Sequence, residues 1–249
     1  MEPIYEKEFV VDDLVTDCFG KWQPSSVLYF VQEMAGQHID RMALEPTPAQ
    51  KGLLWVIIRH RVQIQRLPSK GETIRLETWP MPTTRVAYPR SVVAYDEKGE
   101  ELFRSISLWV LMDKESRAMV LPGKSGIMVR GIVRGNELPS PHSLMPGACA
   151  ASVIRRVGFT DLDANIHMNN CRYLEWAADL LPASFHKDHI LQDVTMCYLS
   201  EAREGDQLEI FWEMDTEGVL HMDIQRREKD KNIHIFTADL HYSISCSVN

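Results

Sequence analysis

The sequence predicts an α+β fold built from two similar units, each with one long helix and an antiparallel β-sheet that covers it. Three observations lead to this prediction. Two segments have the three- and four-residue apolar spacing of an amphipathic helix, strand-like segments with hairpin turns follow each of them, and short motifs recur at a nearly constant separation. A length of 249 residues is sufficient for two such units.

The two predicted helices begin at polar residues and carry apolar residues on one face. The first begins at Ser25-Ser26 and continues to Ile39, and the second follows Asn169-Asn170 and stops at Pro182. Serine and asparagine accept hydrogen bonds from the first amides of a helix, whereas proline inside a helix removes an amide and clashes with the preceding turn. Each helix is expected to have about four turns.

Strand-like segments follow the two helices in the same order. After the first helix we expect strands at 53–65, 72–79, 86–95 and 102–112, with a turn at 96–99. After the second helix we expect strands at 194–199, 207–214, 220–227 and 233–245, with a turn at 229–232. The matching order indicates that one helix-plus-sheet unit occurs twice.

Short identical or similar pairs support this duplication. Thr16-Asp17 recurs as Thr160-Asp161, and Gly71-Glu72 recurs as Gly205-Asp206 at a slightly smaller separation. A longer loop after the first helix accounts for the smaller second separation. A nearly constant separation of this kind is the sequence signature of a duplicated structural unit.

A long helix wrapped by an antiparallel sheet is the hotdog arrangement. The expected fold is therefore a tandem (double) hotdog, with two long helices each wrapped by an antiparallel β-sheet. We expect an N-terminal repeat at 1–128 and a C-terminal repeat at 129–249. A linker at about 113–150, rich in proline and glycine, leaves room for one short helix.

Composition excludes several classes of function. The net charge is −8 and no block of Lys and Arg occurs, so we expect no nucleic-acid partner. The longest apolar run, Leu53 to Ile58, is too short to span a membrane, and the acidic first residues do not resemble a signal peptide, so a cytoplasmic protein is expected. His186 and His189 have no further ligand motif, and no metal or other cofactor is expected. An odd number of cysteines without a C-x-x-C pair predicts reduced thiols: Cys18, Cys149, Cys171, Cys197 and Cys246.

Polar residues just before the second helix differ from the first repeat. Asp163, Asn165 and His167 alternate along the chain, so an extended segment would place all three side chains on one side, next to the free amides of a helix start. When Thr160 is aligned with Thr16, they correspond to Phe19, Lys21 and Gln23. Such residues are also common in caps and turns, and their spacing alone leaves both interpretations open.

A second carboxylate favours the functional interpretation. Glu201 follows the apolar strand at 194–199, and it corresponds to Leu67 when Gly205 is aligned with Gly71. A charged residue at the end of a buried strand is either solvated or directed into a site. Only the second repeat therefore carries the four polar residues, which predicts one site per chain.

On these residues, and on motifs elsewhere in the chain, the sequence resembles the acyl-acyl-carrier-protein thioesterases of plants and bacteria. The motifs run from Asp163 to Tyr173, from Tyr198 to Glu201, from Gly52 to Arg59, from Pro68 to Glu72, from Thr78 to Pro80, and from Ser107 to Asp113. The resemblance implies two hotdog repeats and a thioester hydrolase. The implied substrate is a fatty acyl chain on the phosphopantetheine arm of acyl carrier protein, and its hydrolysis releases free fatty acid and ends chain elongation.

The resemblance also implies site residues. It places catalytic residues at Asp163, Asn165, His167 and Glu201, and leaves open whether Asp163 or Glu201 is the general base. Many plant members have a cysteine directly after the glutamate, whereas this chain has Ala202, which favours water as the nucleophile. We expect the oxyanion at the start of the second helix.

Besides the catalytic residues, the resemblance implies a pocket for the acyl chain and a docking surface for the carrier protein. We expect the acyl pocket in the first repeat, with Phe30, Met34, Trp55 and Ile57 as candidate lining residues. The carrier is acidic, so a local basic patch is expected to bind it. Candidate residues for this patch are Arg59, Arg61 and Arg66, or Arg130 and Arg134, or Arg155 and Arg156.

Several alternatives stay open at this point. The chain could be an acyl-coenzyme-A thioesterase, another hotdog enzyme that acts on acyl thioesters, or a non-catalytic acyl-binding module. It could be a monomer or a homodimer, because two repeats in one chain already satisfy hotdog pairing. Acyl chain length depends on how side chains close the pocket, which is not visible in the sequence.

Overall fold

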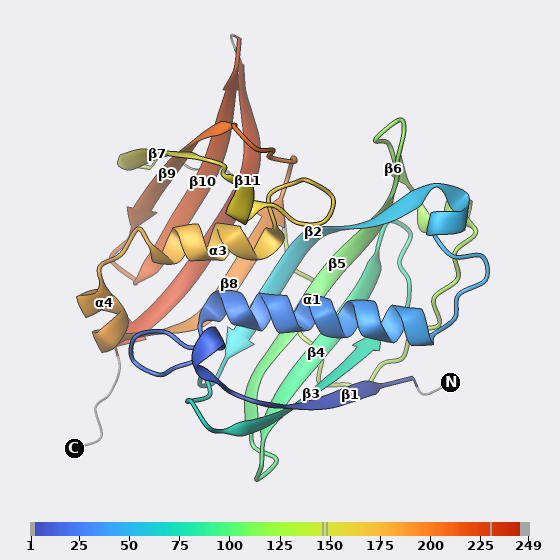
Figure 1. The fold of residues 1–249 in the computed structure, drawn as a ribbon, viewed down its shortest axis with the longest axis horizontal. Helices are drawn as coiled ribbons and strands as arrows, with labels where there is room; N and C mark the ends of the chain where they lie inside the picture. The colour runs from blue at the N-terminus through green and yellow to red at the C-terminus, as the bar shows by residue number, and fades with distance from the viewer. Residues whose placement is uncertain (1–2, 146, 148, 230, 245–249) are drawn as a thin grey trace. The chain divides into compact units, whose positions relative to one another are not determined.

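The computed structural model describes residues 3–145, 147, 149–229 and 231–244, which divide into two units. Unit 1 contains the described residues of Met1–Gln23 and Tyr29–His142, and unit 2 contains those of Pro24–Leu28 and Ser143–Asn249. Each unit has one antiparallel set of strands with a helix on its face (Figure 1). The predicted repeat boundary at 128/129 stays a prediction.

The strands of unit 1 lie in the order β1-β3-β4-β5-β2, and all neighbours are antiparallel. A short strand β6 pairs with β5. The bounds are β1 Tyr5–Val10, β2 Leu53–Ile64, β3 Thr73–Pro80, β4 Tyr88–Asp96, β5 Glu101–Asp113 and β6 Met119–Val120. Short 3₁₀ turns occur at Asp13–Val15 and Ala49–Lys51.

Helix α1 (Pro24–Arg41) lies across these strands (Figure 1). Proline at its first position fits the helix because the amide it lacks would have no intrahelical partner. The Phe30 ring packs 4.7 Å from Phe9 on β1 and 5.0 Å from Trp22. Val31 and Met34 are completely buried, and such burial contributes about 1.5–3 kcal/mol for each side chain. The apolar face of the helix therefore forms much of the core of unit 1.

The strands of unit 2 lie in the order β8-β11-β10-β9-β7, again antiparallel. Their bounds are β7 Ala151–Arg156, β8 His189–Tyr198, β9 Gln207–Met214, β10 Val219–Glu228 and β11 Lys231–Ile244. Helix α3 (Asn170–Ala178) lies on one face, where the Tyr173 ring stacks 4.6 Å from Phe236 on β11. A 3₁₀ turn at Phe159–Asp161 precedes α3, and helix α4 (Ala183–Asp188) follows it.

The expected helices and strands occur in the expected order, with differences in extent, and strand β6 and helix α4 are additional elements that the sequence did not predict. Helix α3 has nine residues, so the prediction of four turns was wrong for it. After Ala178 the amides of Leu180 and Leu181 bond to carbonyls three residues back, and the helix ends in turns before Pro182. The single short helix expected in the linker is confirmed as α2 (Pro122–Ser125).

The sequence prediction missed β1 and β7, the outer strands of the two units. Both strands expose most of their side chains, and charged, mostly exposed strands are typical of sheet edges. The four described cysteines form no disulfide, and Cys246 lies outside the described residues. Residue 230 of the predicted turn and residue 245 of the last predicted strand also lie outside them.

Candidate active site

A tight loop closes in front of helix α3. Leu162 and Met168 form an isolated antiparallel bridge, and the residues between them make the loop. The Asp163 carboxylate Oδ1 accepts hydrogen bonds from the amides of Asn165 (2.8 Å) and His167 (3.2 Å), and the Asp163 amide donates to the His167 carbonyl (2.8 Å). The expectation of an extended segment was therefore wrong, because the chain folds back around Asp163.

The loop brings His167 to Glu201. The Met168 amide donates to the Ala202 carbonyl (2.8 Å), which fixes the segment after β8 beside the loop. The His167 Nε2 atom lies 3.2 Å from Glu201 Oε2, and the two side chains are 18% and 32% exposed. Both groups are thus paired and still reachable from solvent. Figure 1 shows the C-terminal end of β8 close to the N-terminus of α3.

An arginine that sequence reasoning missed holds the Glu201 backbone. Arg226 on β10 donates through Nη1 to the Glu201 carbonyl (2.9 Å) and to Asp206 Oδ2 (2.7 Å). Arg203 lies further out, with Nη2 3.9 Å from Glu201 Oε2. The available sequence signal for this anchor was the recurrent Gly205-Asp206 pair, because Asp206 is the residue that Arg226 contacts.

Asn165 is held by the same loop aspartate, with its Nδ2 3.4 Å from Asp163 Oδ2. The structure therefore brings all four predicted residues into two contacting pairs. Asp163 contacts Asn165, and His167 contacts Glu201.

The start of helix α3 offers one backbone donor. Asn169 caps the helix, with its side-chain oxygen accepting from the Cys171 amide (2.9 Å), and its own amide donates to the Asp161 carbonyl (2.8 Å). The Asn170 amide is at the first helical position, where no intrahelical acceptor exists. This amide and the positive end of the helix dipole can stabilise a negative oxygen.

The counterpart loop of unit 1 corrects the assumed alignment of the repeats. There the isolated bridge joins Thr16 and Trp22, so Thr16 is the counterpart of Leu162 and not of Thr160. Asp163 then corresponds to Asp17, and the expectation that the first repeat lacks this aspartate was wrong. Between the two bridged pairs, the aspartate is the same and the other four positions differ: Ala164 against Cys18, Asn165 against Phe19, Ile166 against Gly20 and His167 against Lys21.

An apolar cavity of about 200 Å³ lies in unit 1 beneath helix α1. Of the four candidate lining residues, Trp55 lines this cavity. Met34 and Ile57 are buried elsewhere in the core, and Phe30 packs on Phe9 and Trp22. The lining residues are Gln32, Ala35, Gly36, Ile39, Trp55, Pro80, Tyr88, Pro89, Arg90, Trp109 and Val129.

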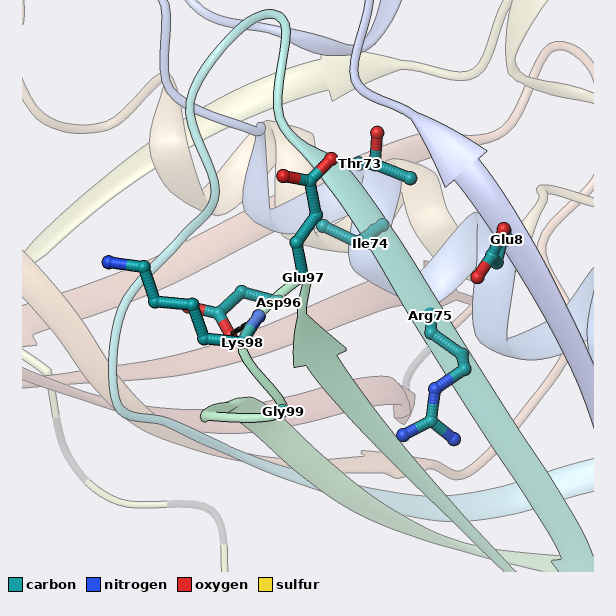
Figure 2. A pocket seen from close by; sticks show the side chains of 8 residues that line it. All are labelled: Glu8, Thr73, Ile74, Arg75, Asp96, Glu97, Lys98 and Gly99. Atoms are coloured by element: carbon teal, nitrogen blue, oxygen red, sulfur yellow. Dashed lines mark hydrogen bonds between the residues drawn. The ribbon is translucent and has the colours of Figure 1, made fainter.

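A second hollow, of about 320 Å³, lies between β1, β3 and the turn at 96–99. Figure 2 shows charged side chains of both signs around it, including Glu8, Arg75, Glu97 and Lys98. The predicted site residues all lie elsewhere. Among the described residues, no group of three or more His, Cys, Asp or Glu side chains is placed to hold a metal ion, and no helix is long and apolar enough to cross a membrane.

Two family models match the chain. The model of the acyl-ACP thioesterase N-terminal domain matches residues 2–121, and that of the C-terminal domain matches residues 152–239. The chain belongs to the acyl-ACP thioesterase family. The second match covers the loop, helix α3 and Glu201, so the candidate active site lies in the C-terminal acyl-ACP thioesterase domain.

Curated acyl-ACP thioesterases are similar over most of the chain. A palmitoyl-acyl carrier protein thioesterase of Gossypium hirsutum is 28% identical over 176 residues, covering 66% of this chain and 42% of that protein. One from Cuphea hookeriana is 27% identical over 214 residues, covering 78% and 50%. An oleoyl-acyl carrier protein thioesterase of Coriandrum sativum is 23% identical, covering 81% and 60%. The chain spans about half the length of these relatives.

Solved structures confirm the double hotdog fold. An acyl-ACP thioesterase from Bacteroides thetaiotaomicron superposes with a TM-score of 0.82 at 21% identity, covering 97% of this chain and 98% of that one. A 12:0-ACP thioesterase from Umbellularia californica also gives 0.82, at 19% identity and 98% coverage of both chains. At these identities the likeness shows the fold alone.

Cysteine chemistry is disfavoured at this candidate site. Position 202 is a buried alanine, and the nearest thiol along the helix start, Cys171, is buried as well. Burial raises the pKa of the Cys171 thiol to about 12, so it is protonated at neutral pH. The carboxylates of Asp163 and Glu201 and the imidazole of His167 are therefore the groups that the site offers for chemistry, with the Asn170 amide as a hydrogen-bond donor.

Proposed function

We propose that the chain hydrolyses the thioester of fatty acyl-acyl carrier protein, releasing free fatty acid and ending chain elongation. The observation that carries this proposal is the pairing of His167 and Glu201, 3.2 Å apart, beside the start of helix α3 in a member of the acyl-ACP thioesterase family. The counterpart positions in unit 1 are Lys21 and Leu67, which cannot form such a pair. One site per chain follows from this difference.

In the proposed reaction Glu201 accepts a proton from a water molecule, and the resulting hydroxide attacks the thioester carbonyl. His167 holds the carboxylate through the contact between Nε2 and Oε2 and orients the water. The carbonyl oxygen becomes negative and is stabilised by the Asn170 amide at the N-terminus of α3. The carbon–sulfur bond then breaks, and the proton held by Glu201 passes to the departing phosphopantetheine thiolate. Asn165 orients the substrate. General-base assistance of this kind contributes about 10²–10⁴-fold.

The acyl chain is proposed to occupy the apolar cavity of unit 1. Three aromatic rings line it, from Trp55, Tyr88 and Trp109, and Ala35 on helix α1 forms part of its wall. Replacing Ala35 with leucine would add side-chain volume to this wall. We expect A35L to lower kcat/KM for long acyl chains more than for short ones, and equal loss for all lengths would place the acyl chain elsewhere.

The acidic carrier protein is proposed to bind through Arg156. Among the predicted arginines, Arg66 already pairs with Glu72 and Asp96, and Arg155 pairs with Asp179 at 3.0 Å. Arg156 is exposed at the edge strand β7 of unit 2. R156E should lower kcat/KM for acyl-acyl carrier protein and leave hydrolysis of acyl-coenzyme A unchanged, whereas an equal effect on both substrates would contradict the docking role.

A comparison of substrates tests the proposed function itself. Acyl-acyl carrier protein should be hydrolysed with a higher kcat/KM than the matching acyl-coenzyme A. Faster hydrolysis of acyl-coenzyme A would identify a coenzyme-A thioesterase, and a bound fatty acyl ligand without hydrolysis would identify an acyl-binding module. The predicted cytoplasmic location, and the choice between monomer and homodimer, stay predictions.

A further inference from the structure

Two loops of the chain, one in each unit, have the same hydrogen bonds around an aspartate. In unit 1, Asp17 Oδ1 accepts from the amides of Phe19 (2.8 Å) and Lys21 (3.0 Å), and the Asp17 amide donates to the Lys21 carbonyl (2.7 Å). The corresponding contacts of Asp163 in unit 2 measure 2.8, 3.2 and 2.8 Å. The aspartate therefore has the same structural task in both loops.

The surroundings of the loops match as well. Both loops reach a left-handed backbone conformation at corresponding residues, with φ of 70° at Gly20 and 62° at Ile166. The next contacts also correspond, as the Trp22 amide donates to the Pro68 carbonyl at 2.9 Å and the Met168 amide to the Ala202 carbonyl at 2.8 Å. The correspondence thus extends from the loop to the segment that carries Glu201.

Only unit 2 combines this loop with catalytic chemistry. Unit 1 keeps Asp17 although it has Lys21 in place of His167 and Leu67 in place of Glu201. The aspartate is therefore needed to build the loop whether or not a reaction takes place there. In unit 2 its Oδ1 already accepts from two backbone amides, and its Oδ2 accepts from the side-chain Nδ2 of Asn165 at 3.4 Å, so both oxygens serve the loop.

We infer that Asp163 is a positioning residue, which closes the loop and directs His167 and Asn165, and that Glu201 is the general base. This inference rests on the proposed function. A base must collect a proton from water, and the Glu201 carboxylate is partly exposed next to His167. The hydrogen bonds of Asp163, which Asp17 repeats in unit 1, require an oxygen that accepts hydrogen bonds. They do not require a group that takes up a proton.

The difference between an acceptor and a base can be tested with two substitutions at one position. Asparagine forms the same turn as aspartate, because its side-chain oxygen also accepts from the amides that follow. We expect D163N to keep kcat/KM for acyl-acyl carrier protein within about tenfold of the wild type. D163A should lose about 100-fold or more, because the loop no longer holds His167 in place. The acid limb of the pH profile of kcat/KM should be unchanged in D163N.

Asp17 provides the matched control. D17A removes the same hydrogen bonds in a loop without chemistry, so it should lower the Tm about as much as D163A while kcat/KM stays near the wild-type value. D17N should restore the Tm, as D163N does. The inference is wrong if D163N folds like the wild type and is as inactive as D163A, or if D163A retains full activity.

Failure of the inference can be told apart from failure of the proposed function. Wild-type hydrolysis of acyl-acyl carrier protein decides the function. The ratio of D163N to D163A activity decides the role of Asp163. A wild type that hydrolyses no acyl thioester would overturn both. A wild type that hydrolyses only acyl-coenzyme A would overturn the carrier-protein substrate and leave the role of Asp163 to be decided on that thioester.

Discussion

Replacing Glu201 with glutamine removes the proposed base and little else. The amide oxygen of glutamine can still lie near His167 Nε2, which is 3.2 Å from the carboxylate in the wild type. The backbone of residue 201 stays bonded to Arg226, and the side chain is one-third exposed, so the stability should change by less than about 0.5 kcal/mol. Loss of general-base assistance should lower kcat by about 10²–10⁴-fold. At about 1.36 kcal/mol for each tenfold change, this corresponds to about 2.7–5.4 kcal/mol of activation free energy.

The assay is steady-state release of free fatty acid from a purified acyl-acyl carrier protein, together with thermal denaturation of each variant. E204Q is a matched control, because Glu204 is exposed further along the same segment. It should have wild-type kcat and Tm. The reasoning would be refuted by an E201Q variant that folds normally and keeps kcat within threefold of the wild type.

Three further predictions concern stability and the thiol. Y173A should lower the free energy of unfolding by about 3–5 kcal/mol in urea denaturation, because the buried Tyr173 ring stacks on Phe236 at 4.6 Å; a loss below about 1 kcal/mol would contradict this. C171A should retain wild-type kcat, since burial raises the pKa of the Cys171 thiol to about 12, and a large loss of kcat without loss of Tm would indicate a nucleophilic thiol. Burial lowers the pKa of His60 from 6.5 to about 3, so below pH 6.5 only the unfolded chain takes up this proton and stability falls towards pH 3. Compared with H60L, the wild type should lose about 2–3 kcal/mol more between pH 6.5 and 4.5, and parallel pH curves would show that His60 is not the cause.

The helices and inner strands were predictable because their side chains repeat with the period of the structure. Strand β9 was placed at 207–214, the bounds that the structure has, since buried Leu208 and Ile210 alternate with more exposed residues there. The edge strands β1 and β7 lack such a pattern. In the part of the chain that the structure describes, each of them pairs with a strand on one side only, and most of their side chains are in water, so periodicity carries little information about them.

Aligning the two repeats by identical residues gives the wrong correspondence. Aligning Thr160 with Thr16 also matches Tyr173 with Tyr29, yet Tyr29 is 55% exposed and Tyr173 is buried. In the alignment that the two loops define, Tyr173 corresponds to Val27, and both are core residues on a helix face. At this position the two repeats share a buried side chain and not an identical residue, and burial cannot be read directly from the sequence.

The candidate site was predictable in composition and not in geometry. Asp163, Asn165, His167 and Glu201 were predicted from a comparison with the first repeat and from the family resemblance, although the comparison was wrong for Asp163, whose counterpart is Asp17. Their arrangement depends on backbone hydrogen bonds between the loop and the segment after β8, such as that of Met168 with Ala202, which join parts of the chain that are far apart in sequence. Arg226 was not predicted because its contact with the Glu201 backbone also joins residues that are far apart in the sequence.

The most direct test converts the site of unit 2 into its counterpart in unit 1. The double variant H167K/E201L places the residues of Lys21 and Leu67 at the corresponding positions of unit 2. Release of free fatty acid from acyl-acyl carrier protein is measured for the wild type and for this variant, with Tm as the control of folding. We expect rapid release by the wild type and a loss of at least about 100-fold in a folded variant. A folded variant that hydrolyses the substrate as fast as the wild type would show that the reaction takes place elsewhere in the chain.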